Sequence, residues 1–574
     1  MFKKNAEFTN GTFSNNANFS HTQFHADAIF TQREFKGDAD FSSGVVIKGK
    51  ALFDVNGVAG KADFSEATFN DKFTFKDVEV VGETTFSNTE FKKNANFESG
   101  SFVDNAHFSN SRFHSDALFS QREFKQQADF TVATFEEEAN FEKGSFGKFT
   151  TFNMAQFNGN TLFTYREFKQ KSDFSESTFQ QGANFKYGRF EIISFDKAQF
   201  QGDVLFTQRI FTSSCNFNNL EAQDIDLRAI HFKRKGDYDG LFKLDFTNCS
   251  CGSVNFSQSY IGTALNIVNS HFQELILNEV TVEKGVDFDL KDVSIHHLSF
   301  NKYKNKSENV LFDFVTVTNK LNIKHVSFDK ERFNHFDISK PNIEIENSAF
   351  NSNFFNSVKW GTISEKRYTA TRDIFRQLKF FSEQQKNYID ADGFYSLEMK
   401  EQKKELLKEN KKLKSIPEKI SHFFTNIFVF YLHEKTSDFS QNWWLPVVWL
   451  IFLGMLGVIG KNFDINQNDT KIAIYFSLIF IFLGGFTAFL YKYIEQKKVP
   501  ATVIKVFAIV PIVLTSLKLA PDFLDDLTLM LNPINLFKTN ALFEHEFISL
   551  VYRILVLFLV YQVVASIKKK VRSK

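Results

Sequence analysis

The chain has 574 residues, a net charge of +1, 76 phenylalanines and three cysteines. It is too long for one compact domain, and its balanced charge provides no global field that would attract nucleic acid. Cys215, Cys249 and Cys251 give no disulfide framework and are too few for a structural zinc site. The opening "MFKKNAEFTN" lacks the apolar region of a cleaved signal peptide. These features predict a reducing compartment for the N-terminal part.

The phenylalanines recur in alternating steps of five and six residues, without interruption from Phe86 to Phe190. A step of five turns an α-helix by roughly 140°, so alternate rings would leave a shared helical face. The intervening Asn, Asp, Gly, Ser and Thr favour turns, and a flat strand has a period of two. The eleven-residue unit with two apolar anchors therefore predicts a β-solenoid whose rings point to one axis.

A longer period is superimposed on this one. "TQREF" (31–35) recurs as "SQREF" (120–124), "TYREF" (164–168) and "TQRIF" (207–211), and the last three are about 44 residues apart. This spacing predicts a coil of about 22 residues, with two coils per super-repeat. A ladder of stacked rings is a sufficient core and needs no cofactor. The rings expected in this structural ladder include Phe64, Phe69, Phe97, Phe102, Phe124, Phe130, Phe152 and Phe163.

The segments "NAEFTNGTF", "KADFSEATF" and "SDFSESTF" resemble the pentapeptide-repeat proteins, in a Phe-rich variant that alternates "ADF" with "ATF". The resemblance is strong from residue 5 to about 217. It implies a mainly β fold, the right-handed quadrilateral β-helix. It also implies that the small residue two positions before each ring points inward, as at Ala62, Ala67, Ala95 and Ala128. We therefore expect a regular solenoid over 1–217 and a degenerate continuation over 218–365.

Residues 366–419 are expected to form a helical hairpin neck and a basic linker. Ile374, Leu378 and Phe381 have helical spacing, as do Phe394 and Leu397, and "YIDADG" (388–393) is expected to separate the two helices. The segment also resembles the helical module that follows the repeats in membrane-linked members of the family. Eight lysines against four glutamates between 400 and 419 favour an approach to a membrane.

Residues 420–574 are expected to form a helical transmembrane domain of about four spans. The apolar segments are about 443–460, 472–491, 500–519 and 547–566. The shorter segment 420–433 is expected to lie in the membrane interface. Lysines precede the first span, join the second to the third and end the chain, so both termini are expected to be cytoplasmic. This predicts a multi-pass protein of a bacterial inner membrane.

Arg553 is the first candidate for a function within the membrane, because charges inside a span are costly and often functional. Asp525 and Asp526 in the preceding acidic loop could pair with it, and the alternative is that Arg553 extends to the interface. Pro511 could form a hinge in the third span, although such positions also serve helix packing. The segment 520–547 could be a re-entrant loop or an interfacial helix.

Some membrane-linked pentapeptide-repeat proteins resemble two-helix ion channels with a pore loop at this place. The segment 520–547 has no TVGYG-like filter, which argues against potassium selectivity. The glycines Gly454, Gly457 and Gly460 fall on one stripe of the first span and are typical of close helix packing.

We expect no enzyme, because no nucleotide loop, nucleophile elbow or carboxylate dyad is present in the sequence. His296 and His297 with Cys249 and Cys251 are a poor metal site, because adjacent residues of a strand point to opposite faces. No catalytic residue, metal or cofactor is therefore predicted.

Two hypotheses remain. The first is a membrane-anchored, non-catalytic scaffold whose solenoid face binds an unknown protein partner. The alternative is an oligomeric ion channel or pore gated through the solenoid. The bilayer is the one partner that the composition predicts directly, a homo-oligomer is compatible with either hypothesis, and nucleic acid is not expected.

Overall fold

The computed structural model describes residues 1–232, 243–350, 358–442, 444–461, 523–532 and 546–572. The chain divides into two compact units, Met1–Gln377 and Leu378–Lys574. The first unit is built mainly of short β-strands, and the second is built of helices.

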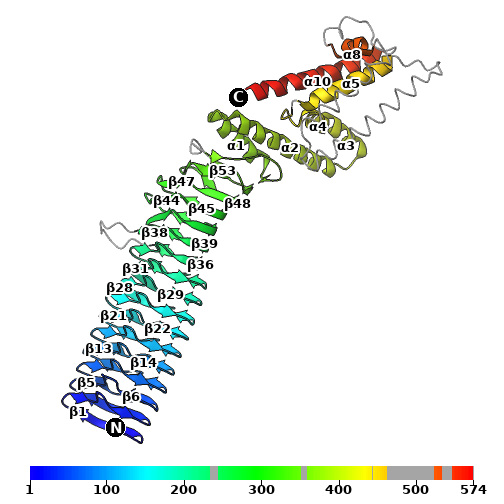
Figure 1. Cartoon of the computed structure of the whole chain (residues 1–574). Helices are drawn as coiled ribbons and strands as arrows, with labels where there is room; N and C mark the ends of the chain where they lie inside the picture. Colours follow the sequence, from blue (N-terminus) through cyan, green and yellow to red (C-terminus); the bar gives the residue numbers. More distant parts are fainter. Residues whose placement is uncertain (233–242, 351–357, 443, 462–522, 533–545, 573–574) are drawn as a thin grey trace. The chain divides into compact units, whose positions relative to one another are not determined.

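The first unit is a parallel β-solenoid whose coils stack along the chain (Figure 1). Each strand pairs with the strand one coil before and one coil after it. For example, β17 (Ala106–His107) pairs with β13 (Thr84–Thr85) and with β21 (Ala128–Asp129). Partner residues are 22 positions apart in the sequence, in agreement with the coil length that the super-repeat predicts. One sheet contains 53 strands, and β49 (Ser327–Phe328) pairs separately with β53 (Ala349–Phe350).

The eleven-residue period has a backbone cause at the corners. Residues in the left-handed region recur every eleven positions, for example Glu66 (φ 60°), Asp77 (φ 59°) and Asn88 (φ 57°). A corner of the "DFS" type is held by its own side chains: the Asp63 carboxylate accepts hydrogen bonds from the Ser65 amide (2.9 Å) and hydroxyl (2.6 Å). Asp, Asn and Ser bond their local backbone in this way more readily than other residues do. The two polar residues of each repeated "DFS" triplet therefore form the corner, and the phenylalanine between them fills the core.

Four inward rings occupy the four sides of each regular coil. In one coil these are Phe86, Phe91, Phe97 and Phe102, all fully buried. Rings of successive coils stack face to face, as Phe97 and Phe119 do (4.7 Å between centroids, 1° between planes). Rings on opposite sides meet edge to face across the coil, as Phe86 and Phe97 do (5.1 Å, 85°). Both arrangements are favourable for aromatic quadrupoles, so phenylalanine alone can fill most of the core.

Beyond residue 217 the solenoid continues with longer strands and a mixed Leu, Ile and Val interior. The longer strands of this part are β36 (Glu221–Asp226), β39 (Ser250–Asn255), β42 (His271–Ile276), β45 (Ser294–Asn301), β48 (Thr316–Lys324) and β52 (Asn342–Glu346). The last strand is β55 (Tyr368–Thr369), which pairs with β52. The Arg367 side chain donates to the carbonyls of Ile338 (2.8 Å) and Pro341 (3.1 Å) and so satisfies backbone acceptors at this end.

A helical hairpin follows the last strand in the chain, but the break between its helices is not where the sequence predicts it. Helix α1 (Arg372–Gln384) ends before "YIDADG", and that segment forms the first turns of α2 (Tyr388–Lys412). Lys386 adopts φ 58° in the connection, and the Asn387 side chain accepts a hydrogen bond from the Asp390 amide as the N-cap. The predicted break was wrong because Asp390 stabilises a helix N-terminus, a role that outweighs its turn propensity here.

The chain then continues through α3 (Ile416–His422), the π turn η1 (Phe423–Ile427) and α4 (Phe428–Ser437). Three apolar helices follow in the described residues: α5 (Trp444–Lys461), α8 (Phe523–Leu531) and α10 (Glu546–Arg572). They share a cluster of Val458, Leu527, Met530, Tyr552 and Val556. A Cβ on Gly457 would stand 2.5 Å from the Tyr552 hydroxyl, and one on Gly454 would stand 2.6 Å from Leu531. These two glycines therefore serve close helix packing.

Within these described helices, one is long and apolar enough to cross a membrane, over Glu546–Lys569. It covers the predicted span 547–566. The predicted span 443–460 corresponds to a shorter apolar helix, Trp444–Val458. The predicted spans 472–491 and 500–519 lie outside the described residues, as does Pro511.

Candidate binding surface

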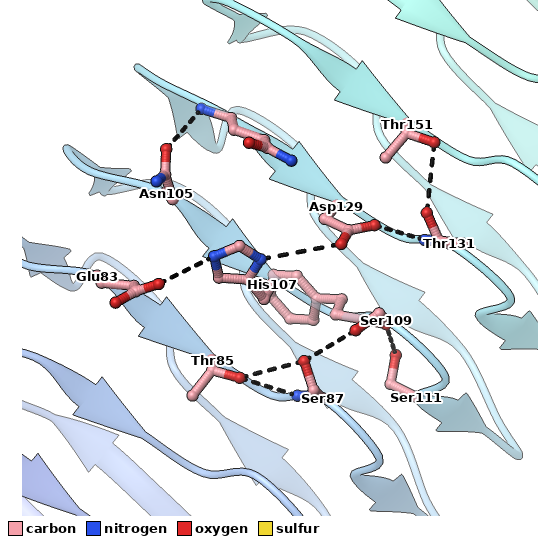
Figure 2. Close-up of polar contacts among 12 residues, drawn as sticks. Glu83, Thr85, Ser87, Asn105, His107, Ser109, Ser111, Asp129, Thr131 and Thr151 are labelled. Carbon is pink, nitrogen blue, oxygen red and sulfur yellow. Dashed lines mark hydrogen bonds and ion pairs between the residues drawn. The ribbon is translucent and has the colours of Figure 1, made fainter.

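The outer face of the regular coils carries polar side chains in register. Thr85, His107, Asp129 and Thr151 occupy equivalent positions of four successive coils, each one residue before an inward ring. Figure 2 shows these side chains on the outside of the sheet, with the corner residues beside them. We call this column and its corner residues the polar face.

His107 links three coils on the polar face (Figure 2). Its Nε2 atom lies 3.2 Å from a Glu83 oxygen, and its Nδ1 atom lies 3.9 Å from an Asp129 oxygen. The Asp129 and Glu83 carboxylates raise the pKa of His107, against the opposing effect of its partial burial. The pKa of Glu83 is lowered, first by the hydrogen bond from Lys61 (3.0 Å). Protonated His107 therefore joins the coil before it to the coil after it.

Hydroxyl groups continue the contacts along the neighbouring corner. The Ser87 and Ser109 hydroxyl oxygens lie 3.0 Å apart, and those of Thr131 and Thr151 lie 3.4 Å apart. The Thr131 amide donates to Asp129 (2.9 Å). The polar face thus has a regular spacing of donors and acceptors set by the coil stacking, which suits recognition of a complementary protein surface.

A second histidine of the same coil makes similar contacts on another side. The Nε2 atom of His114 lies 3.0 Å from a Glu90 oxygen, and its Nδ1 atom lies 2.9 Å from a Glu136 oxygen. His107 and His114 lie next to different inward rings. These two histidines therefore connect neighbouring coils on different sides of the solenoid.

Three fully buried arginines were missed by reasoning from the sequence. Arg122, Arg166 and Arg209 belong to "SQREF", "TYREF" and "TQRIF", and each is 0 % exposed. Arg122 donates to the carbonyls of Phe97 (2.7 Å), one coil away, and of Val78 (2.6 Å) and Phe75, two coils away. Arg209 repeats this pattern with the carbonyls of Phe185 (2.9 Å), Phe163 (3.4 Å) and Arg166. These side chains therefore tie three successive coils together.

Three glycines that precede the arginines allow close approach of the coils: a Cβ on each would stand within 2.6 Å of a carbonyl oxygen of the preceding coil, and on Gly144 it would also stand 2.9 Å from the Arg166 Nη1 atom. Gly100, Gly144 and Gly188 lie one coil before Arg122, Arg166 and Arg209, all with positive φ. The guanidinium groups also lie on rings of the core: Arg166 is 4.2 Å from the Phe146 centroid and Arg209 is 3.9 Å from that of Phe190. Rings next to the arginines are tilted, as Phe102 and Phe124 are (46°). Alternation of Arg with Gly explains why the super-repeat has two coils.

The guanidinium groups are held by carbonyls and rings rather than by ion pairs at contact distance. Burial lowers the pKa of each of the three to about 9, so each remains charged at pH 7. In Arg166 the Nε and Nη2 atoms are buried without a hydrogen-bond partner. The role of these arginines is architectural. The pattern that could have indicated their burial is a Gly that precedes each Arg by 21 or 22 positions in the sequence.

The ring positions named from the sequence all lie in the interior. Each is at most 1 % exposed. Six of them stack on a ring of the next coil, as Phe64 does on Phe86 (4.6 Å) and Phe130 on Phe152 (4.7 Å), whereas Phe102 and Phe124 are tilted against each other (46°). The eight are Phe64, Phe69, Phe97, Phe102, Phe124, Phe130, Phe152 and Phe163. They provide the rigid support for the polar face and take no direct part in it.

The candidate residues of the membrane segment fall on two helices. Arg553 is half-buried on α10, next to Tyr552 in the cluster shared with α8. Asp525 and Asp526 lie on α8, so this part of the segment 520–547 is helical. The hypothesis of a conducting path depends on 472–519, which lies outside the described residues.

His296 and His297 do not point to opposite faces, so that prediction was wrong. Their rings lie against each other (4.8 Å between centroids, 30°), and both are half-exposed. The register of β45 with β48 shifts between Ile295 and His297, which places both histidines on the outside of a corner. Cys249 and Cys251 are buried thiols whose pKa values are raised by desolvation. Among the described residues, no group of three or more His, Cys, Asp or Glu side chains is arranged so that it could hold a metal ion.

Comparison with known proteins bears on the solenoid alone. Residues 167–208 match the family model described as pentapeptide repeats, in nine copies. None of the curated proteins and none of the solved structures compared with the chain matches it. The matched residues run from β28 (Glu167–Asp173) to β33 (Val204–Leu205). They include core residues that contact the Arg209 side chain, which lies just after the matched range. Residues 167–208 of the Phe-filled β-solenoid therefore match pentapeptide repeats.

Proposed function

We propose that the protein is a membrane-anchored, non-catalytic scaffold that holds a protein partner on the polar face of its solenoid. One observation carries the proposal: the polar face is continuous from coil to coil, while the interior behind it is closed by stacked rings. A filled interior offers the face no pocket for a small substrate, whereas a long regular surface suits an extended protein contact.

Membrane anchoring rests on α10. Its apolar stretch Glu546–Lys569 is long enough to span, and Phe547, Ile554 and Tyr561 expose large apolar surfaces (75 %, 56 % and 66 %). A helix of this kind with lipid-facing apolar side chains is typical of a membrane span. A bacterial inner membrane with cytoplasmic termini remains part of the proposal, through the lysines that flank the apolar segments.

The test compares two substitutions by lysine on opposite sides of the same coil. Asp129→Lys changes the polar face, and Asn140→Lys changes the outward position two sides further along the coil. Full-length protein in membranes is cross-linked in its native cell, and the partners recovered with each variant are compared. A scaffold requires a partner that Asp129→Lys loses and Asn140→Lys retains. Equal recovery with both variants, in chains of equal stability, would contradict use of the polar face.

The same protein in planar bilayers tests the alternative of a channel. A silent bilayer containing inserted protein agrees with the scaffold. Discrete and reproducible openings would show that the protein conducts, and anchoring alone would then be an insufficient description.

A further inference from the structure

A stripe of large apolar side chains is exposed along α3, η1 and α4. Ile416, Ile420, Phe424 and Phe428 are 72 %, 53 %, 62 % and 39 % exposed, and they are four residues apart. In a regular α-helix a spacing of four drifts around the axis by roughly 40° per step. The π turn η1 contains an extra residue in its turn, which offsets this drift. We call these four residues the apolar stripe.

The opposite side of the same segment is attached to α2. Ile427 is fully buried, the Lys403 ammonium contacts the Glu434 carboxylate, and Lys400 lies 3.0 Å from Asp438. The segment is therefore fixed in orientation by contacts on one side. The apolar stripe lies on the side that these contacts leave uncovered.

Contacts at the end of α4 place it beside the ends of the apolar helices. The Ser437 hydroxyl donates to Gln562 of α10 (2.9 Å), and the Trp449 indole of α5 donates to the Lys435 carbonyl (2.9 Å). Gln562 is followed by Ser566 and by Lys568, Lys569 and Lys570, where the apolar stretch of α10 ends. If α10 spans a bilayer, α4 therefore lies at the level of its surface.

The sequence next to the apolar stripe is basic. Five lysines and two glutamates lie between 408 and 419, and Lys408, Lys411, Lys412 and Lys414 are exposed. An exposed apolar face next to a lysine cluster is typical of helices that lie in the surface of anionic membranes. The lysines complement anionic headgroups, and the apolar stripe complements the acyl chains beneath them.

We propose that α3, η1 and α4 lie in the surface of an anionic bilayer, with the apolar stripe inserted beneath the headgroups. The inference rests on the proposed membrane anchoring and adds a second contact that fixes the orientation of the hairpin on the membrane. Its partner is an anionic lipid surface rather than a segment of this chain or a second copy.

The test uses the full-length chain carrying an environment-sensitive fluorophore on one introduced cysteine. Phe424→Cys reports the apolar stripe, Asn426→Cys is a control on the same turn off the stripe, and Ile554→Cys reports the span of α10. The wild-type chain taken through the same labelling reaction controls for Cys215, Cys249 and Cys251, which are buried. Each protein is reconstituted into phosphatidylglycerol/phosphatidylcholine vesicles with and without brominated acyl chains.

The expected result is quenching of the fluorophores at 424 and 554 by brominated lipid, with little quenching at 426. Replacing phosphatidylglycerol by phosphatidylcholine, or changing Lys411, Lys412 and Lys414 together to Gln, should reduce quenching at 424 and leave 554 unchanged. Quenching at 554 without quenching at 424 would overturn the surface helix and leave the anchor intact. If brominated lipid does not quench the fluorophore at 424 and aqueous iodide does not reach it, protein covers the apolar stripe. This result would also overturn the inference. Absence of quenching at both sites would remove the proposed anchoring itself.

Discussion

Gly144 lies one coil before Arg166, and a Cβ on Gly144 would stand 2.9 Å from the Arg166 Nη1 atom. The same Cβ would stand 2.6 Å from the Arg122 carbonyl oxygen of the coil before. The glycine thus provides the space through which an arginine side chain crosses one coil to reach the next. Buried charge in a hydrophobic core is costly, and here the Lys143 carbonyl and the ring faces of Phe124 and Phe146 compensate for it in part.

Gly144→Ala should destabilise the solenoid more than Gly44→Ala does. Both glycines have positive φ (69° and 78°), which costs about 1–2 kcal/mol for any residue with a Cβ. Nothing lies within 4 Å of a Cβ on Gly44, so that variant measures the backbone cost alone. The crowding at Gly144 should add about 1–3 kcal/mol to the loss in the free energy of unfolding. Chemical denaturation followed by circular dichroism measures both, and equal losses would show that Arg166 does not occupy this space.

Arg122→Met should cost more than Arg166→Met. Arg122 donates three hydrogen bonds to carbonyls, whereas two nitrogens of Arg166 are buried without a hydrogen-bond partner. A hydrogen bond to a charged group contributes about 1.5–3 kcal/mol, while removing a poorly compensated buried charge can be neutral or favourable. We expect a difference of about 1–3 kcal/mol between the two variants in denaturation experiments. The reverse order would mean that desolvation of Arg122 outweighs its bonds.

His107→Gln should weaken the solenoid more at low pH than at high pH. The carboxylates of Asp129 and Glu83 raise the pKa of His107 in the folded protein above its unfolded value. The folded state therefore holds the proton more tightly. The stabilisation is complete below the unfolded pKa and is lost as the pH rises through the folded pKa. The difference between wild type and variant should be about 0.2–1 kcal/mol near pH 5.5 and smaller near pH 8.5. Denaturation curves at the two pH values check this, and a difference that does not change with pH would exclude a charged His107.

Phe124→Ala should cost about 3–5 kcal/mol, because it removes a fully buried ring and leaves a cavity between Phe102 and Phe146. Tyr165→Ala is the matched control: this aromatic side chain is 54 % exposed on a corner of the same solenoid. Its loss should cost about 0.5–1.5 kcal/mol, because it removes the stacking of Tyr165 on the Tyr187 ring. A loss at Phe124 as small as that at Tyr165 would show that the solenoid does not depend on its ring ladder.

The internal architecture of the solenoid was largely predictable because it is local and repeated. Each ring of the ladder is followed by its own polar corner, so the spacing between Phe97 and Phe119 in the sequence is also the spacing of one coil. The buried alanines, such as Ala95 and Ala128, followed from the resemblance to pentapeptide-repeat proteins and not from the period of the rings. When every coil repeats one sequence pattern, the length of the repeat is sufficient to predict which residues pair between strands.

The buried arginines could not be predicted in this way. An Arg in a polar corner sequence normally indicates exposure. Its burial depends on carbonyls up to 47 positions earlier and on a glycine one coil before it. The start of α2 was misjudged for a related reason, because Asp390 can serve a turn or a helix N-terminus and its partner Asn387 decides between them.

The sequence by itself determined the repeating coil, its inward rings and the apolar character of the C-terminal helices, because these depend on residue spacing and composition. The tertiary structure alone decided which polar side chains meet across coils. It brought His107 between Glu83 and Asp129, buried Arg122, and left the stripe from Ile416 to Phe428 exposed. These contacts join residues of different coils or different helices. Their energies depend on distances and burial that no local pattern encodes.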